Sequence, residues 1–395
     1  MNAIKKVFLL ILLGMLSAFG PFVTDMYLPS LPAMADYFSA SLPMVQMGLT
    51  TSMIGLALGQ IFFGPLSDKY GRRPLLLVSM LLFIVSTLFC LFAPDIYSFV
   101  TLRLIQGIAG AGGIVISRSV ATDKFSGKEL AKMLAVIGAI NGVAPVAAPV
   151  IGGLLTGSVG WQGIFMILLF IGILLGIGCI RFKESLPAEK RSKTGVWATF
   201  RSFGIIVHNR RYMLYVFQLA FAQGILFAYI ASSPFIIQQH YGFSPFAFSI
   251  CFAVNAVAIG VAAALSVKFR RTENGTLTGC IGMLVFAVLQ MAALYSGCGF
   301  WTYELLMFAL LFMMGLTFTS STTLAMDCER RYAGAASALL GALCFASGGI
   351  VSPLVGLGDI LISTGVTFVI CAVCSLLCAL WAVKRTGSKV ALCRI

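Results

Sequence analysis

The chain has 395 residues, of which 59% are hydrophobic and only 10% are charged, and this balance excludes a soluble globular protein of ordinary composition. A net charge of +14 would suggest a nucleic-acid partner in a soluble protein, so the location of the basic residues decides what the charge means. The eleven cysteines are scattered rather than paired in motifs, which predicts reduced packing residues and no metal site.

Apolar runs long enough to cross a bilayer recur along the whole chain. About 20 apolar residues form an α-helix that spans the hydrocarbon core. The first run follows Lys5 and Lys6 and continues to Val23, which is longer than the core of a secretory signal, so it is interpreted as an uncleaved helix. Twelve spans are predicted: 7–27, 45–63, 75–92, 97–116, 133–155, 161–180, 212–235, 247–267, 277–295, 301–325, 335–357 and 360–383.

The spans fall into two groups of six, separated by the basic segment 181–211. The predicted fold is therefore an all-α integral membrane protein of two six-helix, pseudo-symmetric bundles, 1–180 and 212–395, joined by a cytoplasmic linker, 181–211. The second half repeats the first only faintly, because residues 268–275 stand where a second hinge loop belongs but lack its glycine and aspartate.

The basic residues predict the orientation of the chain in the membrane. If the spans alternate in direction, every Lys and Arg except Arg103 falls on one side, and basic residues concentrate on the cytoplasmic side of a membrane. Both termini are therefore expected in the cytoplasm of a multi-pass protein of a bacterial-type inner membrane. The orientation of the chain in the membrane then explains the basic charge, and no nucleic-acid partner is expected.

Residues 64–74, between the second and third spans, are predicted to form a loop in water. Glycine and proline punctuate the stretch, and charged side chains that would be costly inside a bilayer gather in it: Asp68, Lys69, Arg72 and Arg73. The pattern resembles the signature loop between the second and third helices of the major facilitator superfamily. An ordinary basic anchor at the cytoplasmic surface is the alternative.

Two ionisable residues clearly lie inside spans, where the cost of burial makes them functional candidates. Asp25 lies near the outer end of the first span, and Arg103 lies six residues into the fourth, at a similar depth. Burial and a neighbouring arginine act in opposite directions on the charge of an aspartate. We hypothesise that Asp25 carries a proton between the two sides and that Arg103 tunes this step. The alternatives are a helix cap and a permanent ion pair between the two residues.

The fifth span contains small residues at four-residue spacing, which let helices approach closely, and two prolines that bend it. It is similar to the antiporter motif of the same superfamily, with Ala148 where the common pattern has glycine. Packing of an ordinary membrane helix is the alternative. The motif residues are Gly138, Gly142, Pro145, Pro149, Gly152 and Gly153.

With residues 102–112 of the fourth span, 24–29 and 161–165, the chain resembles the bicyclomycin-resistance (Bcr/CflA) subfamily of drug/proton antiporters. The resemblance implies a two-lobed monomer with a central cavity that exports a small molecule against an inward proton flux, driven by the proton gradient without a cofactor. It also implies a cytoplasmic gate in which Asp68 faces the eleventh helix and Arg72 pairs with Asp123. Gly64, Gly71 and Arg73 complete the gate motif.

Several alternatives remain open. Tyr27, Asn141, Gln218 and Asn255 are candidate cavity residues, although polar side chains in spans also bond helix to helix. A proton-coupled uptake carrier or a metabolite exporter would use the same fold. An enzyme is not expected, because the two histidines accompany no nucleophile or ligand cluster, and a receptor would not need Asp25. Asp25 is the only acid of the first span, which puts a stoichiometry above one proton in doubt.

Overall fold

The computed structural model describes residues 3–125, 127–191, 203–329 and 333–392, and every element in these ranges is helical. The chain divides into two compact units, one of Met1–Thr199 with Ser244–Ser249 and one of Phe200–Phe243 with Ile250–Ile395. The prediction of an all-α membrane protein is confirmed.

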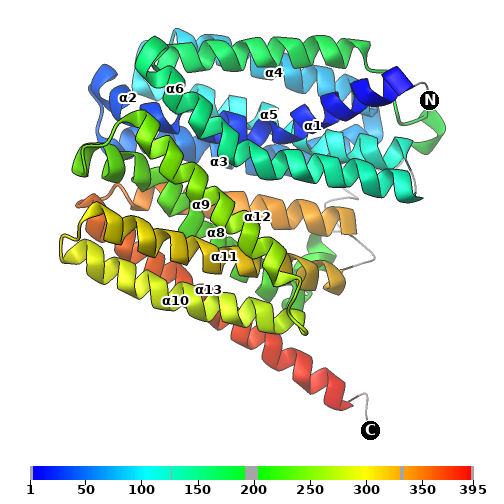
Figure 1. Ribbon diagram of the computed structural model, residues 1–395. Coiled ribbons are helices and arrows are strands. Elements are labelled where there is room, and N and C mark those ends of the chain that lie inside the picture. The colour runs from blue at the N-terminus through cyan, green and yellow to red at the C-terminus, as the bar shows by residue number, and fades with distance from the viewer. Residues whose placement is uncertain (1–2, 126, 192–202, 330–332, 393–395) are drawn as a thin grey trace. The chain divides into compact units, whose positions relative to one another are not determined.

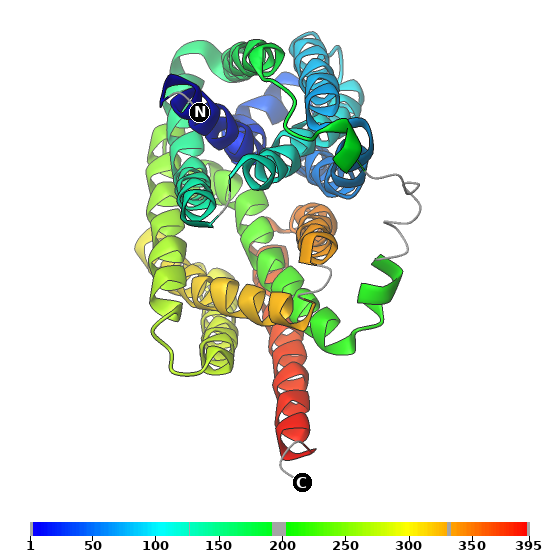
Figure 2. The same ribbon diagram turned by 90° about the vertical axis from the view of Figure 1, so that its right-hand side faces the viewer.

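The first unit contains five long helices and three short ones (Figure 1). Figure 2 looks nearly along the axes of several of the long ones. The elements are α1 (Ala3–Asp25), η1 (Leu28–Ser30), α2 (Leu31–Tyr37), α3 (Leu42–Tyr70), α4 (Arg72–Leu91), α5 (Ile96–Lys124), α6 (Gly127–Arg181) and η2 (Ala188–Lys190).

The second unit contains the remaining helices, beginning with a short helix at 203–207. Its elements are α8 (Arg210–Phe235), η3 (Ile236–His240), most of α9 (Pro245–Ser266), α10 (Thr272–Tyr295), α11 (Phe300–Cys328), α12 (Ala333–Leu354) and α13 (Ile360–Leu392). The core at one end of this unit gathers buried residues such as Ile206, Tyr212, Ala325 and Ala382.

Eleven helices in the described residues are long and apolar enough to cross a membrane, whereas twelve spans are predicted. The difference lies in α6, whose apolar segment Val143–Arg181 has 39 residues. At 1.5 Å per residue a straight helix of that length would measure about 58 Å, roughly twice the hydrocarbon core. Gly160 interrupts it with a non-helical φ of 66°, so the segment consists of two helices joined at a kink. The fifth and sixth predicted spans are thus joined without a loop.

The helices of the first unit pack backbone to backbone where α3 crosses α5. A Cβ atom on Gly55 would lie 2.3 Å from the carbonyl oxygen of Leu104, and one on Gly107 would lie 2.1 Å from that of Ser52. Such distances are too short for any side chain, so only glycine permits this approach. The contact fixes the part of α5 that carries Arg103 against α3.

A similar contact joins the second and fourth long helices of the second unit. A Cβ atom on Gly315 of α11 would lie 2.5 Å from the carbonyl oxygen of Ile259 on α9. Both units therefore bring the same two helices of their order together through glycine. The two units therefore resemble each other in how these helices pack, although their sequences show only a faint repeat.

The expected loop at residues 64–74 is wrong, because nearly all of the stretch is helical. Helix α3 runs through Pro65 to Tyr70, and α4 begins at Arg72, so Gly71 alone separates them. Pro65 removes one backbone donor without ending the helix, and Pro74 stands in the first turn of α4, where N–H groups lack intrahelical partners anyway. Gly71 makes the turn with a φ of +103°, which other residues rarely adopt.

Candidate functional site

Asp25 is the last residue of α1, at a break in the helix within the first unit. The chain continues through Met26 and Tyr27 into η1, whose first residues are Leu28 and Pro29. Asp25 is only 6% exposed, and its Oδ1 accepts a hydrogen bond of 2.7 Å from the Thr24 hydroxyl. The carboxylate stands at the negative end of the helix dipole, where an ionised acid is disfavoured.

The break after Asp25 packs directly against the second proline-containing turn of α6. A Cβ atom on Gly152 would lie 1.8 Å from the carbonyl oxygen of Met26. Gly152 is buried, and Pro145 and Pro149 lie inside the helix just before it. The small residue thus lets α6 touch the backbone next to Asp25.

We expect Gly152→Ala to destabilise the protein by about 1–3 kcal/mol and to impair transport, because the added methyl group must displace the Met26 backbone. Gly157→Ala is the matched control on the same helix, since a Cβ atom there would meet no neighbouring atom within 4 Å. Thermal unfolding in detergent, measured beside transport, checks the pair. Equal stability and activity in both variants would contradict a tight contact at Gly152.

Arg103 is completely buried on α5 and donates hydrogen bonds to α1, to α3 and to its own helix. Its Nη2 donates to the carbonyl oxygen of Val23 at 2.9 Å, its Nε to that of Gly48 at 3.4 Å, and its Nη1 to Oε1 of Gln106. Among the described residues, no ion pair joins Arg103 to Asp25. Since Val23 is two residues from the end of α1, Arg103 binds one of the carbonyls that a helix end leaves without intrahelical partners.

Aromatic rings enclose the Arg103 guanidinium. Its Cζ lies 4.4 Å from the centre of the Tyr27 ring and 5.7 Å from that of Phe165, within the range of cation–π attraction. Trp161 and Phe99 extend this cluster, with ring centres 6.0 Å apart. Phe165, one of the residues 161–165 that contribute to the family resemblance, therefore packs against the buried arginine.

Gln106 extends the network to a fourth helix. Its side-chain nitrogen donates to the Thr87 hydroxyl on α4 at 2.7 Å while its oxygen accepts from Arg103. Gln106 and Thr87 are both completely buried. The arginine is thus held in one orientation by a hydrogen-bond network that joins α1, α3, α4 and α5.

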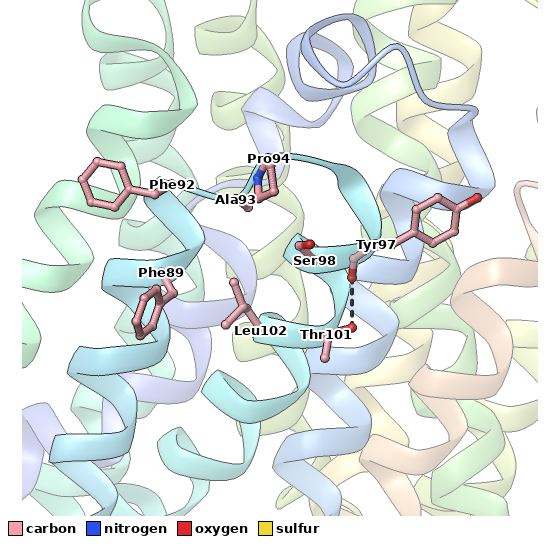
Figure 3. Close-up of a pocket in the computed structure, with 8 residues that line it drawn as sticks. All are labelled: Phe89, Phe92, Ala93, Pro94, Tyr97, Ser98, Thr101 and Leu102. Carbon is pink, nitrogen blue, oxygen red and sulfur yellow. Dashed lines mark hydrogen bonds between the residues drawn. The ribbon is translucent and has the colours of Figure 1, made fainter.

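A hollow of about 480 Å³ lies where α4 and α5 are joined (Figure 3). In its lining the Thr101 hydroxyl donates to the carbonyl oxygen of Tyr97 at 2.9 Å. The lining contains no carboxylate and no basic side chain, so we assign no part of the coupling chemistry to it. The lining residues are Phe89, Phe92, Ala93, Pro94, Tyr97, Ser98, Thr101 and Leu102.

A charged cluster lies at the other end of the first unit, where α3 meets α4. Arg72 is the centre: its Nε lies 2.9 Å from Asp123 Oδ2, and its Nη1 lies 2.5 Å from Asp68 Oδ1 and 2.7 Å from the Ser67 hydroxyl. The pair of Arg72 and Asp123 is the one that the resemblance implies. The expected contact of Asp68 with the eleventh helix would join the two units and stays a prediction.

Glu184, just after α6, completes this cluster and was missed from the sequence. Its two carboxylate oxygens accept from the backbone N–H groups of Arg72 and Arg73, at 3.0 and 3.1 Å, and so bind the first turn of α4. A Cβ atom on Gly71 would lie 2.6 Å from Glu184 Oε2, which is a second reason for glycine there. Arg73 also donates from Nη2 to the carbonyl oxygen of Ile180 at 2.8 Å.

Hydrogen bonds outweigh burial in setting the charge of Glu184. Burial raises its pKa, but the backbone N–H groups of Leu186, Arg73, Arg72 and Ser185 donate to the carboxylate and hold the pKa below its ordinary value. The positive end of the α4 dipole acts in the same direction.

We expect Glu184→Gln to lower stability by about 1 kcal/mol, the usual cost of losing a helix cap. Because the pKa is lowered on folding, this contribution is complete above the ordinary value near 4.5 and is lost as the pH falls through the lower folded value. Melting temperatures measured against pH should therefore fall less steeply on the acid side for the variant. Glu189→Gln, at an exposed site of the same segment, should behave as wild type. Parallel pH profiles for all three proteins would contradict the prediction.

The other predicted residues have different surroundings. Gln218 is completely buried and donates to the Ser375 hydroxyl at 3.1 Å, so it joins α8 to α13. A Cβ atom on Gly64 would lie 3.6 Å from the Val115 side chain, and Gly153 is buried. Three further predicted residues are not among those whose surroundings the structure describes: Gly138, Asn141 and Gly142.

Asn255 leads to a second residue that sequence reasoning missed, Glu304. The Asn255 side-chain nitrogen donates to Glu304 Oε1 at 2.9 Å and to the Tyr229 hydroxyl oxygen at 3.0 Å. The sequence did contain a signal for this residue, because Glu304 is an acid within the apolar run of the predicted span 301–325. Its closeness to the start of that span makes it resemble an interfacial residue in the sequence.

No metal site is apparent in the described part of the chain, where no group of three His, Cys, Asp or Glu side chains is arranged to hold an ion. The ten cysteines in this part are free thiols.

Comparison with known proteins agrees with this architecture. Residues 10–353 match the family model described as the Major Facilitator Superfamily. The chain is 39% identical over 362 residues to an uncharacterised MFS-type transporter, YdgK, of Bacillus subtilis, with 90% of each chain covered. It is 30% identical over 364 residues to a bicyclomycin resistance protein homolog of Haemophilus influenzae, again with 90% of each covered. A bacterial homolog of the human lysosomal transporter Spinster, solved in an inward-facing, unoccupied conformation, has the same fold, with a TM-score of 0.79, 17% identity, and coverage of 97% of this chain and 99% of that one.

Proposed function

Because the chain belongs to the major facilitator superfamily, and is thus a multi-pass membrane transporter rather than an enzyme, we propose that it exports drug-like or small amphipathic compounds in exchange for protons. The observation that carries the proposal is the buried carboxylate of Asp25 at the break in α1. The proton gradient drives the exchange by alternating access, and no cofactor takes part.

Asp25 suits a proton carrier because no basic side chain pairs with it in the described structure. A permanent ion pair would hold the aspartate ionised, whereas a buried, unpaired one takes up a proton when water is remote and releases it when water is near. Arg103 influences the step through α1 itself, since it binds the Val23 carbonyl two residues away. A movement of α1 relative to α5 would change the field of the arginine at Asp25.

Export rather than uptake is supported by two observations. The relative from Haemophilus influenzae is described as a bicyclomycin resistance protein homolog, and export of the compound is the way in which a membrane transporter confers resistance. The contact of Gly152 with Met26 also joins the antiporter-like motif to the Asp25 region. A proton-coupled uptake carrier and a metabolite exporter on the same fold are the alternatives.

We also propose the arrangement in the membrane. Both termini lie on the cytoplasmic side of a bacterial-type inner membrane, as the one-sided distribution of basic residues supports. The bundles are 1–180 and 212–395 with the linker 181–211 between them, the working form is a monomer, and the substrate occupies a central cavity. The charged cluster of Arg72, Asp68 and Asp123 closes the cytoplasmic side.

Everted membrane vesicles test the function. With a pH gradient, acid inside, vesicles containing the protein should accumulate bicyclomycin or a fluorescent organic cation above the level of vesicles without it. An ionophore that exchanges protons for potassium should remove that excess. Accumulation that survives collapse of the pH gradient would contradict proton coupling, and movement in the opposite direction would favour the uptake carrier.

A further inference from the structure

The second unit contains a partly buried acid near the start of α11, and one of its carboxylate oxygens is buried. Glu304 follows the first residue of α11, Phe300, by four positions, and its Oε1 accepts a hydrogen bond from Asn255 on α9. Asn255 also donates to the hydroxyl of Tyr229 on α8. The acid is therefore bound directly to a side chain of α9 and is connected through it to α8.

The polar atoms around Glu304 are enclosed and incompletely satisfied. Asn255 and Tyr303 are completely buried and Tyr229 is 1% exposed. Within the described residues, three buried atoms have no hydrogen-bond partner: Glu304 Oε2, Asn255 Oδ1 and the Tyr303 hydroxyl oxygen. Leaving such groups unpaired costs about 1–3 kcal/mol each, which indicates that the cluster is kept for a function.

In the described residues, no ion pair neutralises Glu304. The titratable groups that interact with it are Tyr229 of α8, Cys251 of α9 and Tyr303 of its own helix. Tyr241, after η3, interacts with Tyr303 and packs against the His240 ring. The sequence has no Lys or Arg between Arg211 and Lys268 or between Arg271 and Arg330. A desolvated carboxylate without a counter-charge favours its neutral form.

The helix that carries Glu304 corresponds in order to the helix that carries Arg103 in the first unit. Each lies on the fourth long helix of its unit, and each is connected to the first and second long helices. Arg103 binds Val23 of α1 and Gly48 of α3, while Glu304 reaches Tyr229 of α8 through Asn255 of α9. The two halves thus carry opposite ionisable groups near the start of the same helix in their order.

We propose that Glu304 is a second proton-binding site, which takes one proton on Oε2 from water on one side and returns it to water on the other in each transport cycle. This deepens the proposed function and rests on it: one proton is carried at Asp25 and one at Glu304. The occupant is a proton rather than an organic cation, because Oε2 is a buried atom that solvent does not reach.

Infrared difference spectroscopy of the full-length protein in lipid tests the proposal without a substrate. Between neutral and alkaline pH, the carboxylic-acid carbonyl band should contain a component that disappears in Glu304→Gln and persists in Asp359→Asn. Gln retains the acceptor for Asn255 and so preserves the packing. Asp359 is the matched control, an exposed acid that accepts from the backbone of Leu361 and Ile362. If Glu304→Gln fails to fold, Glu304→Asp should restore the band at a shifted position.

The possible results separate this proposal from the function itself. An unchanged band in Glu304→Gln overturns the second site, even if export through Asp25 is intact. If Glu304→Gln loses the band but the wild-type protein shows no gradient-driven export, the proton-binding site at Glu304 is supported and the proposed antiport is rejected. A variant that keeps the wild-type band and fails only with cationic substrates would assign Glu304 to substrate contact and overturn the proposal.

Discussion

Replacing Asp25 by Asn is expected to reduce gradient-driven accumulation in everted vesicles to the level of vesicles without the protein. Asn occupies the same volume, and its side-chain oxygen still accepts the hydrogen bond from Thr24, but it cannot bind and release a proton. Substrate binding and downhill movement should persist, because the loss concerns coupling alone. The measurement compares accumulation driven by the pH gradient with downhill efflux from preloaded vesicles.

Asp36→Asn is the matched control for this variant. Asp36 lies only eleven positions further on, in α2, but it is exposed, so neutralising it should leave both measurements unchanged. Full accumulation in Asp25→Asn would transfer the coupling to another acid, and Glu304 would be the first to examine.

Arg103→Met should cause the largest loss of stability among single substitutions in the first unit. It leaves the Val23 and Gly48 carbonyls and the Gln106 side chain without their donor. Each buried acceptor that loses its donor lowers the free energy of unfolding by about 1–3 kcal/mol. It also removes the positive charge from the negative end of α1. Thermal unfolding in detergent should therefore shift strongly downward, and transport should be abolished.

Arg103→Lys separates the charge from the hydrogen bonds. Lysine keeps the positive charge but cannot bind acceptors on several helices with a planar guanidinium. We expect intermediate stability and a changed pH dependence of transport, because the field at Asp25 is altered rather than removed. Arg118→Lys, at an exposed position on the same helix, should match wild type in both measurements. Wild-type stability in Arg103→Met would contradict the central role of the arginine in packing.

The apolar spans could be predicted because they depend on local composition. The connections between the spans could not be predicted in this way. Gly160 replaces an expected loop by a single non-helical residue, and the composition of residues 64–74 suggests a break where α3 continues to Tyr70. Glycine and proline weaken a helix, but tertiary packing decides whether it ends.

The partners of the site residues were also beyond the sequence. The depth of Asp25 and Arg103 followed from counting residues, yet Arg103 binds the backbone carbonyls of Val23 and Gly48, which carry no sequence signal. Glu304 stood near the end of a span and resembled an interfacial residue. Glu184 lay in a basic linker, and only the fold brings it to α4.

The anchoring of Glu184 has a practical consequence for dividing the gene. Residues that follow the last helix of the first unit still belong to that unit, because Glu184 binds the start of α4 and Arg191 lies 4.0 Å from Glu184. Two co-expressed half-proteins should therefore be separated after Arg191. A cut directly after Arg181 would leave the first fragment without Glu184, which caps its helix α4. Glu184 would then belong to the second fragment.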